Sequence, residues 1–130
     1  MIERIFPPGA PAPRGPYSPA VKAGDYIYVA GQIPADPVTG KVITGDVRLE
    51  TEQVLKNIRS ILEGCGSSLE DVVRCGVFLT DAADFQAMNE VYAQFFSVAK
   101  PARTTVIVAA LPLKDARVEI DAVAYKPAGR

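Results

Sequence analysis

Residues 72–96, VVRCGVFLTDAADFQAMNEVYAQFF, combine two hydrophobic periodicities within one short stretch. The first part, residues 72–79, is apolar and rich in β-branched side chains, which predicts a strand. After Asp81 or Asp84, either of which suits the N-terminal cap of a helix, apolar residues recur at helical spacing. They predict a helix whose apolar face consists of Phe85, Met88, Tyr92, Phe95 and Phe96. The stretch therefore predicts a strand followed directly by a helix.

The sequence on the N-terminal side repeats this order of strand and helix. YIYVA, residues 26–30, predicts a strand, and DPVTGK, residues 36–41, predicts a loop because of its Asp, Pro and Gly content. Asp46 is a suitable N-cap for a helix, and Gly64 and Gly66 are expected to end it. The apolar face of this helix is expected to contain Val47, Val54, Ile58, Ile61, Leu62 and Cys65.

The C-terminal side predicts two more strands, over residues 102–109 and 117–125. The segment between them contains Pro112 and suits a hairpin-like connection. The order of strands, helix, strand, helix and two strands predicts an α+β fold in which one mixed sheet carries two helices on one face. At 130 residues the chain is expected to be one domain over residues 1–130.

The predicted strands are apolar on both faces, which indicates an oligomer. Neighbouring residues of a strand point to opposite faces of a sheet, yet Val77 and Phe78 are both apolar, as are Val106 and Ile107. Two helices can cover only one face of such a sheet. The other face is expected to be covered by a second copy of the chain.

Composition narrows the classes of partner and the location. The formal net charge is −1 and the sequence contains no run of like charges, whereas a nucleic-acid-binding protein usually carries a basic stripe. The apolar runs are too short to span a bilayer, and the N-terminal residues do not resemble a signal peptide. We therefore expect no nucleic-acid partner, no membrane association and a cytoplasmic location.

The chain contains no histidine, which is the commonest general base and the commonest ligand of catalytic metals. Any acid–base chemistry must therefore use carboxylate, tyrosine, lysine, cysteine or water. Cys65 and Cys75 lack the spacing of a metal or redox pair, so we expect both to be buried free thiols. The sequence predicts neither a metal site nor a cofactor.

Residues 7–19, PPGAPAPRGPYSP, contain six of the eleven prolines. Such a stretch cannot form a helix or a central strand, and we expect an extended arm or loop. A linker or a polyproline ligand is the alternative interpretation.

Two charged residues on predicted strands are candidates for the chemistry. Arg103 lies at the start of the apolar run PARTTVIVAALP, residues 101–112. It suits a clamp for a carboxylate, because a guanidinium binds a carboxylate through two parallel hydrogen bonds. Glu119 lies between Val118 and Ile120 and suits the activation of a water molecule. Alternatively, Arg103 forms a structural ion pair with Glu119 or Asp121, and Glu119 belongs to a solvated strand face.

Asn89 and Tyr17 are two further polar candidates. Asn89 lies beside the apolar face of the second predicted helix, where a buried asparagine needs hydrogen-bond partners. Tyr17 lies within the proline-rich arm. A structural hydrogen bond of Asn89 and simple aromatic packing of Tyr17 are the alternatives.

These residues fall within motifs that resemble one family. GPYSPAVKAGDYIYVAGQIPADPVTG (15–40), PART (101–104) and VEIDAVA (118–124) resemble, in this order and spacing, the reactive intermediate deaminase (Rid) family, also called the YjgF family. The resemblance extends from about residue 12 to residue 125. It is strongest to the archetypal enamine/imine deaminase subgroup of that family.

The resemblance implies a fold, an assembly and an activity. It implies a chorismate-mutase-like α+β fold and a homotrimer with clefts between its subunits. It also implies hydrolysis of the reactive enamines and imines that pyridoxal-phosphate enzymes release, such as 2-iminobutanoate and 2-iminopropanoate. The products are 2-keto acids and ammonia, and the family uses no metal or cofactor.

The resemblance also assigns roles to individual residues. Arg103 matches the arginine that binds the substrate carboxylate, and Glu119 matches the glutamate that holds the attacking water. Thr105 matches a position whose main-chain atoms contact the ligand. The remaining substrate-binding positions match Asn89, Tyr17 and Gly31. Ala30 departs from relatives that have serine before the G-Q-I-P motif, so a role for that hydroxyl is absent in this chain.

Two other functions remain open at the level of sequence. The same cleft would serve a keto-acid-binding or chaperone-like module in which Glu119 is not catalytic. An endoribonuclease, which is an older label in this family, is disfavoured because the chain lacks both a basic patch and histidine.

Overall fold

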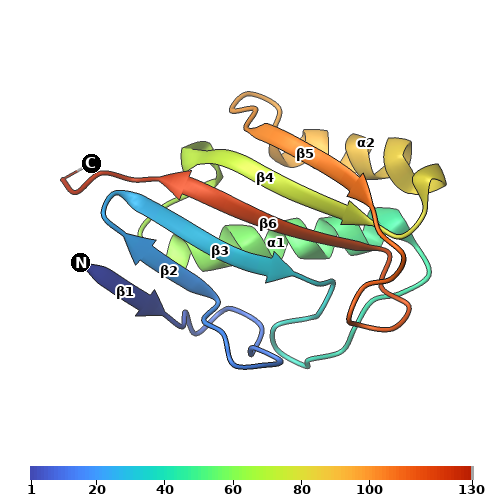
Figure 1. The fold of residues 1–130 in the computed structure, drawn as a ribbon, viewed down its shortest axis with the longest axis horizontal. Coiled ribbons are helices and arrows are strands. Elements are labelled where there is room, and N and C mark those ends of the chain that lie inside the picture. The colour runs from blue at the N-terminus through green and yellow to red at the C-terminus, as the bar shows by residue number, and fades with distance from the viewer. Residues whose placement is uncertain (130) are drawn as a thin grey trace.

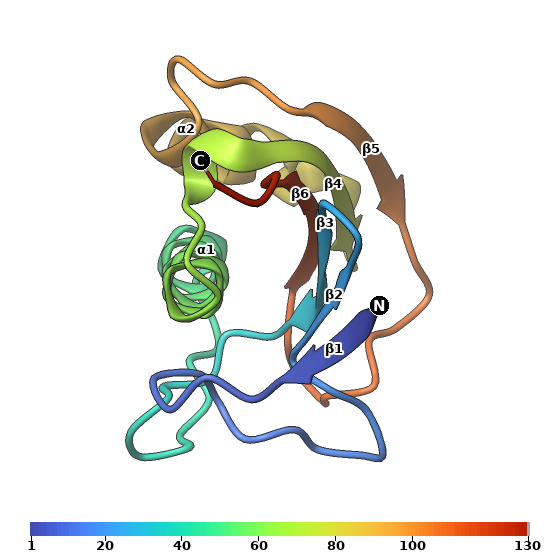
Figure 2. The same ribbon diagram turned by 90° about the vertical axis from the view of Figure 1, so that its left-hand side faces the viewer.

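The computed structural model describes residues 1–129, and these residues form a sheet of six strands packed against two α-helices. Figure 1 shows the sheet in front, and Figure 2 shows both helices on the same side of it. The predicted α+β class and the placement of both helices on one face are therefore confirmed. The strands are β1 (Ile2–Ile5), β2 (Ala20–Ala23), β3 (Tyr26–Gln32), β4 (Val72–Leu79), β5 (Ala102–Ile107) and β6 (Val118–Tyr125).

The sheet is mixed and its spatial order is β1-β2-β3-β6-β4-β5. Strands β4 and β5 pair in parallel, and the other neighbouring strands pair antiparallel. Helix α2 (Phe85–Phe95) connects β4 to β5, as a parallel pair requires. Helix α1 (Val47–Gly64) connects β3 to β4, and β6 lies between those two strands.

The hairpin-like connection predicted after residue 109 is wrong, because β4 separates β5 from β6 in the sheet. The segment after β5 instead passes the end of β4 to reach the middle of the sheet. Strands β1 and β2 were not predicted from the sequence. Both are four residues long and exposed or half-buried over most of their length, so their hydrophobic alternation is weak.

Both helices begin near the predicted aspartates. The Asp46 carboxylate accepts a hydrogen bond from the Arg48 main-chain N–H at 2.9 Å and caps α1. The Asp81 carboxylate accepts from the Ala83 N–H at 2.9 Å and caps the short 3-10 helix η2 (Ala82–Asp84), which continues into α2. A further 3-10 turn, η1 (Leu69–Asp71), precedes β4.

The hydrophobic core lies between the helices and the sheet. Helix α1 contributes Val54, Leu55, Ile58, Ile61 and Leu62, all of which are fully buried. Two expectations about this layer need correction. Cys65 is half-buried, because it lies at the C-terminal cap of α1, and Phe85 is exposed, because it starts α2 at the edge of the sheet. Cys75 is buried as expected.

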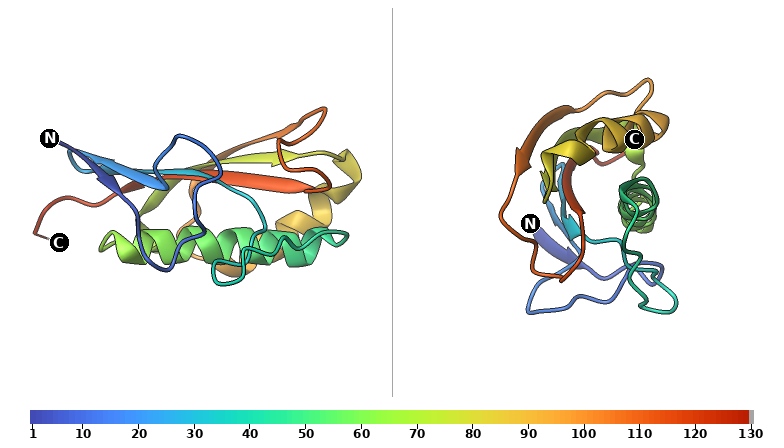
Figure 3. Two further views of the ribbon diagram at one scale, coloured as in Figure 1. Left: turned by 90° about the horizontal axis from the view of Figure 1, so that it is seen from below. Right: turned by 90° about the vertical axis from the view of Figure 1, so that its right-hand side faces the viewer.

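Residues 7–19 form neither helix nor strand, as their proline content predicted. The arm leaves β1, contacts α1 and returns to the sheet at β2 (Figure 3). The Ser60 hydroxyl of α1 donates a hydrogen bond to the Gly9 carbonyl oxygen at 3.2 Å. The arm is therefore anchored to the domain rather than extended away from it as a linker.

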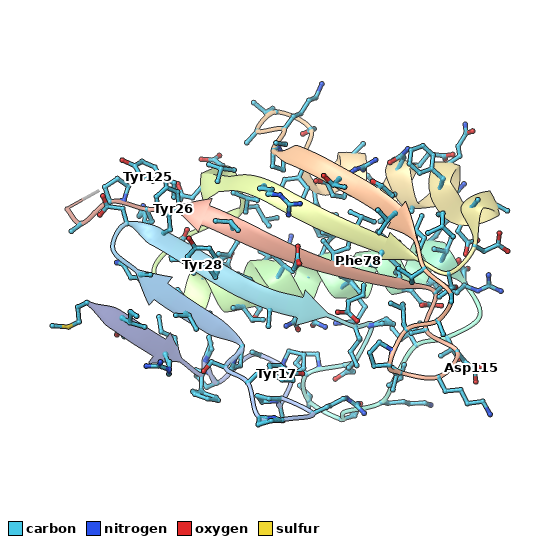
Figure 4. All side chains as sticks on the ribbon, in the orientation of Figure 1. Tyr17, Tyr26, Tyr28, Phe78, Asp115 and Tyr125 are labelled. Atoms are coloured by element: carbon cyan, nitrogen blue, oxygen red, sulfur yellow. The ribbon has the colours of Figure 1, made fainter. Side chains whose placement is uncertain are left out.

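The sheet face opposite the helices is uncovered and aromatic. Tyr26, Tyr28 and Tyr125 are 43%, 49% and 39% exposed, and Phe78 shares this face (Figure 4). The rings of Tyr26 and Tyr125 are in contact, with their centroids 5.2 Å apart. The prediction of apolar side chains on both sheet faces is thus confirmed. Among residues 1–129, no helix is both long and apolar enough to cross a membrane.

Candidate active site

Glu119 projects from β6 on the uncovered face of the sheet. It pairs with Phe78 of β4, and residues directly paired in a ladder share a face. Its side chain packs over Gly31 of β3. Within residues 1–129 its carboxylate has no hydrogen-bond donor and no ion-pair partner. Partial burial is the main cause that raises the pKa of Glu119, and the nearby Asp121 carboxylate raises it further.

Gly31 is required by this arrangement. The pairing of β3 with β6 shifts between Val29 and Gln32, so that Ala30 and Gly31 form an irregularity opposite β6. A Cβ atom at position 31 would collide with Oε2 of Glu119. The glycine therefore makes room for the carboxylate.

A cleft of about 430 Å³ opens beside these two residues. It brings together three of the predicted site residues, namely Tyr17, Gly31 and Glu119. Figure 4 shows Tyr17 on the arm, below the end of β3. The remaining lining residues are Arg14, Ala30, Ile33, Pro112 and Leu113.

Two buried polar residues of α1 form hydrogen bonds to the loops that line this cleft. The Asn57 amide donates to the carbonyl oxygens of Ile33 at 3.3 Å and Ala35 at 2.8 Å, which fixes the segment after β3. The Glu50 carboxylate accepts from the Arg117 main-chain N–H at 2.7 Å, which fixes the end of the loop that precedes β6. Burial raises the pKa of Glu50. Neither residue was predicted from the sequence, although each is a polar group within a helix of clear apolar periodicity.

Arg103 lies on the opposite, helix-facing side of the sheet. It pairs with the buried Cys75, and its guanidinium carbon lies 4.7 Å from the ring centroid of Tyr92 and 5.8 Å from that of Phe85. Its Nη1 atom lies 4.0 Å from the Met88 sulfur. These contacts place the cation on an aromatic surface of α2.

The structural ion pair considered for Arg103 is absent within residues 1–129. Asp121 accepts a hydrogen bond from the Gly76 N–H at 2.8 Å and has Arg74 at 3.9 Å. Glu119 faces the other side of the sheet. The guanidinium of Arg103 therefore has no carboxylate partner among the described residues.

Thr105 and Asn89 lie on the side of Arg103. Thr105 follows Arg103 by two residues in β5, so both share a face of the strand. Asn89 is half-buried on α2 and lines a shallow surface hollow with Phe85, which also contacts Arg103. The predicted site residues thus form two groups, and one chain does not bring the two groups together.

Arg14 is a further site residue that was not predicted from the sequence. It lines the cleft that contains Glu119. A signal was present, because Arg14 is the only charged residue between Arg4 and Lys22. Tyr92 and Phe85 were assigned only to the apolar face of α2, and their contact with Arg103 depends on how β5 packs beside that helix.

Neither the two cysteine thiols nor the acidic side chains of the described residues form a second reactive site. Burial raises the pKa of the Cys75 thiol to about 11, and burial also raises the pKa of Cys65. Residues 1–129 contain no group of three or more Cys, Asp or Glu side chains arranged to hold a metal ion.

Comparison with known proteins places this geometry in a family. A family model described as Endoribonuclease L-PSP matches residues 8–126. The chain belongs to the Rid (YjgF/L-PSP) family. The family membership inferred from the GPYS, GQIP, PAR and EIDA motifs is therefore confirmed.

Relatives within the Rid family align over nearly the whole chain. A RutC family protein of Pyrococcus horikoshii is 54% identical over 126 residues, which cover 97% of this chain and 99% of the relative. A 2-iminobutanoate/2-iminopropanoate deaminase of Dermatophagoides farinae is 43% identical over 119 residues, which cover 92% of this chain and 92% of the relative. The crystal structure of RidA from an Antarctic Psychrobacter has a TM-score of 0.90 and 45% identity, covering 95% of this chain and 98% of that one. Rid family members thus include enamine/imine deaminases, and the fold seen here is the family fold.

Proposed function

We propose that the protein hydrolyses 2-imino acids, and the enamines that tautomerise to them, to 2-keto acids and ammonia. The observation that carries the proposal is the Glu119 carboxylate, which lies half-buried in an apolar cleft without a partner among residues 1–129. A carboxylate in this state is free to bind a water molecule and accept its proton. The deaminase name of a relative with 43% identity supports the same assignment.

The proposed reaction needs little beyond positioning. Water adds to the electrophilic carbon of the protonated imine while Glu119 accepts a proton from that water. The product of this step is a tetrahedral amino alcohol. Glu119 then returns this proton to the nitrogen. The C–N bond breaks and ammonia leaves as the C=O bond forms, while the hydroxyl proton passes to the Glu119 carboxylate and from there to solvent. The raised pKa of Glu119 suits both transfers, because it brings the carboxyl closer to the working pH.

The second part of the proposal concerns Arg103, which would bind the substrate carboxylate. Its guanidinium lies on the Tyr92 ring and has no competing carboxylate within residues 1–129. Because Arg103 and Glu119 lie on opposite faces of one sheet, we propose that each active site uses Arg103, Thr105 and Asn89 of one copy. Glu119, Gly31 and Tyr17 would come from the neighbouring copy.

The proposed assembly is a homotrimer. The uncovered face of the sheet exposes Tyr26, Tyr28 and Tyr125, and such an apolar surface favours association. Three copies that contact one another through this face would bury the aromatic rings. They would also bring the β5 edge of one copy toward the cleft of the next.

A coupled assay tests the activity. A pyridoxal-phosphate serine/threonine dehydratase generates the imine, and semicarbazide traps whatever imine has not yet been hydrolysed. If the proposal is correct, adding the protein lowers the rate of semicarbazone formation in a manner that depends on its concentration. Glu119→Gln should fold normally and remove this effect.

The same assay separates the alternatives. A keto-acid-binding module would retain the keto acid stoichiometrically without changing the rate at which the imine decays. An endoribonuclease would cleave RNA with Glu119→Gln as an inactive control, and it would leave the semicarbazone rate unchanged. Either result would refute the deaminase proposal.

A further inference from the structure

The cleft that contains Glu119 has a second charged residue at its rim. Arg14, on the proline-rich arm, lines the same cleft and is exposed. Within residues 1–129 no carboxylate lies within ion-pair distance of its guanidinium. One carboxylate and one guanidinium therefore share a cleft without neutralising each other.

The position of Arg14 is fixed from two directions. Its main-chain N–H donates a hydrogen bond to the Tyr17 phenol oxygen at 3.1 Å, and its Nη2 donates to the Gly40 carbonyl oxygen at 3.1 Å. Gly40 belongs to a tight turn in which Asp36 accepts hydrogen bonds from two main-chain N–H groups and Gly40 adopts φ +74°. A guanidinium has five N–H donors, so the bond to Gly40 leaves donors available for a ligand.

The space between the two charged groups is larger than a minimal substrate requires. The imine of alanine, 2-iminopropanoate, has only a methyl side chain, whereas clefts of about 430 Å³ accommodate much larger ligands. The walls between Glu119 and Arg14 are mostly apolar and consist of Tyr17, Ala30, Ile33, Pro112 and Leu113. Such walls suit the methylene groups of an extended substrate side chain.

We propose that Arg14 determines specificity by binding a second acidic group, at the end of the side chain of a dicarboxylic 2-imino acid. In this arrangement the imine carbon lies at Glu119, the aliphatic chain follows the apolar walls, and the distal carboxylate accepts hydrogen bonds from Arg14. The inference rests on the proposed deaminase function and adds the substrate class to it. Arg103 remains the residue that binds the carboxylate next to the imine.

The test compares the imines of glutamate and norvaline, which share a carbon chain and differ in the terminal carboxylate. An amino-acid oxidase generates each imine, and semicarbazide traps the imine that has not yet been hydrolysed. The imine of alanine serves as the minimal substrate. We expect the wild-type protein to favour the glutamate imine. Arg14→Gln, whose amide can still donate to Gly40, should lower kcat/KM for the glutamate imine by about 10–100-fold, the value of one charge-assisted contact. It should leave the alanine and norvaline imines within about threefold, a change below 1 kcal/mol.

Arg4→Gln is the matched control, because it removes an exposed arginine on β1 that does not line the cleft. It should leave all three rates unchanged. The proposal is overturned if the wild-type protein shows no preference for the glutamate imine. It is equally overturned if Arg14→Gln slows the alanine imine as much as the glutamate imine, since Arg14 would then bind the carboxylate next to the imine.

A binding measurement keeps this proposal separate from the deaminase proposal. Calorimetry with the two hydrolysis products, 2-oxoglutarate and 2-oxopentanoate, requires no turnover. Tighter binding of 2-oxoglutarate that Arg14→Gln abolishes supports the role of Arg14 even if no imine is hydrolysed. Equal affinity of the wild-type protein for the two keto acids refutes that role, whatever the activity.

Discussion

Mixing two inactive variants should restore activity, because Arg103 and Glu119 lie on opposite faces of one sheet. Arg103→Ala removes the proposed carboxylate clamp, and Glu119→Gln removes the proposed base. If each site takes Arg103 from one copy and Glu119 from the next, a mixed trimer contains some sites in which both residues are wild type. A site built within one chain could never be restored in this way.

The expected size of each single effect follows from the contacts. Arg103→Ala removes two charge-assisted hydrogen bonds to substrate, together about 3–6 kcal/mol, or about 10²–10⁴ in kcat/KM. Its structural contacts are weaker, since the guanidinium stacks at 4.7 Å from Tyr92 and 5.8 Å from Phe85. Loss of these cation–π contacts should lower the free energy of unfolding by only about 1–2 kcal/mol. Glu119→Gln should lower turnover by roughly 10²–10⁴-fold while the fold is retained.

The recovery in the mixture can also be calculated. In a random equal mixture, a site is intact when the copy that supplies Glu119 carries Arg103→Ala and its neighbour carries Glu119→Gln. Each condition holds for half of the copies, so about a quarter of the sites are intact in a cyclic trimer. The unfractionated mixture should reach about 25% of wild-type activity. The isolated mixed trimers, each with one intact site of three, should reach about a third, far above either parent variant.

The assay is imine hydrolysis after the two variants, carrying different tags, are refolded together and the mixed trimers are isolated. Glu119→Gln mixed with the double variant Arg103→Ala, Glu119→Gln is the control, since no site in that mixture contains Glu119. Mixed trimers without recovered activity would refute the site between copies. A monomeric mass in light scattering would refute it independently. Easy unfolding of Arg103→Ala with full activity when folded would show that Arg103 has a structural role only.

Three residues, Gly31, Cys75 and Glu119, and the absence of a metal requirement give four further predictions. Gly31→Ala should keep the circular dichroism spectrum of the wild-type fold. Its rate of imine hydrolysis should fall by about 100-fold or more, because the new methyl group collides with the Glu119 carboxylate. A wild-type rate would show that this contact is unimportant. Iodoacetamide at pH 8 should label Cys75 far more slowly in the folded than in the unfolded protein. Burial raises the pKa of Cys75 to about 11, so little of the reactive thiolate forms at this pH. Rapid labelling of Cys75 in the folded protein would contradict this prediction. Glu119→Gln should raise the free energy of unfolding at pH 7, because the folded environment raises the pKa of Glu119 and disfavours its charged form. This gain should shrink as the pH falls through the raised folded-state pKa of Glu119. It should largely vanish below 4.5, the ordinary pKa, where wild-type Glu119 is mostly protonated in both states. Denaturant titrations that give the same gain at pH 7 and pH 4 would refute the cause. Exhaustive chelation should leave imine hydrolysis unchanged, and a loss of activity that one added metal restores would contradict the proposed mechanism.

Much of the fold was predictable from local patterns. The helix capped by Asp46 and the strand over residues 72–79 were correct, because capping and β-branched apolar runs act over a few neighbouring residues. Strands β1 and β2 were missed because short, partly exposed strands carry little hydrophobic alternation. The hairpin predicted after β5 was wrong. Strands that follow one another in the chain usually pair, but here β4 lies between β5 and β6.

The sequence by itself determined the Rid family, through motifs that span the chain, and it directed attention to carboxylate chemistry, because the chain has no histidine. Only the tertiary structure decided which candidates meet. The alternation of side chains within each strand is a local property, but the face on which Arg103 and Glu119 lie depends on how β5, β4 and β6 align. The placement of Arg14 beside Glu119 likewise depends on the anchoring of the proline-rich arm by α1 and by the turn at Gly40. Such contacts join residues far apart in the chain, and no local pattern specifies them.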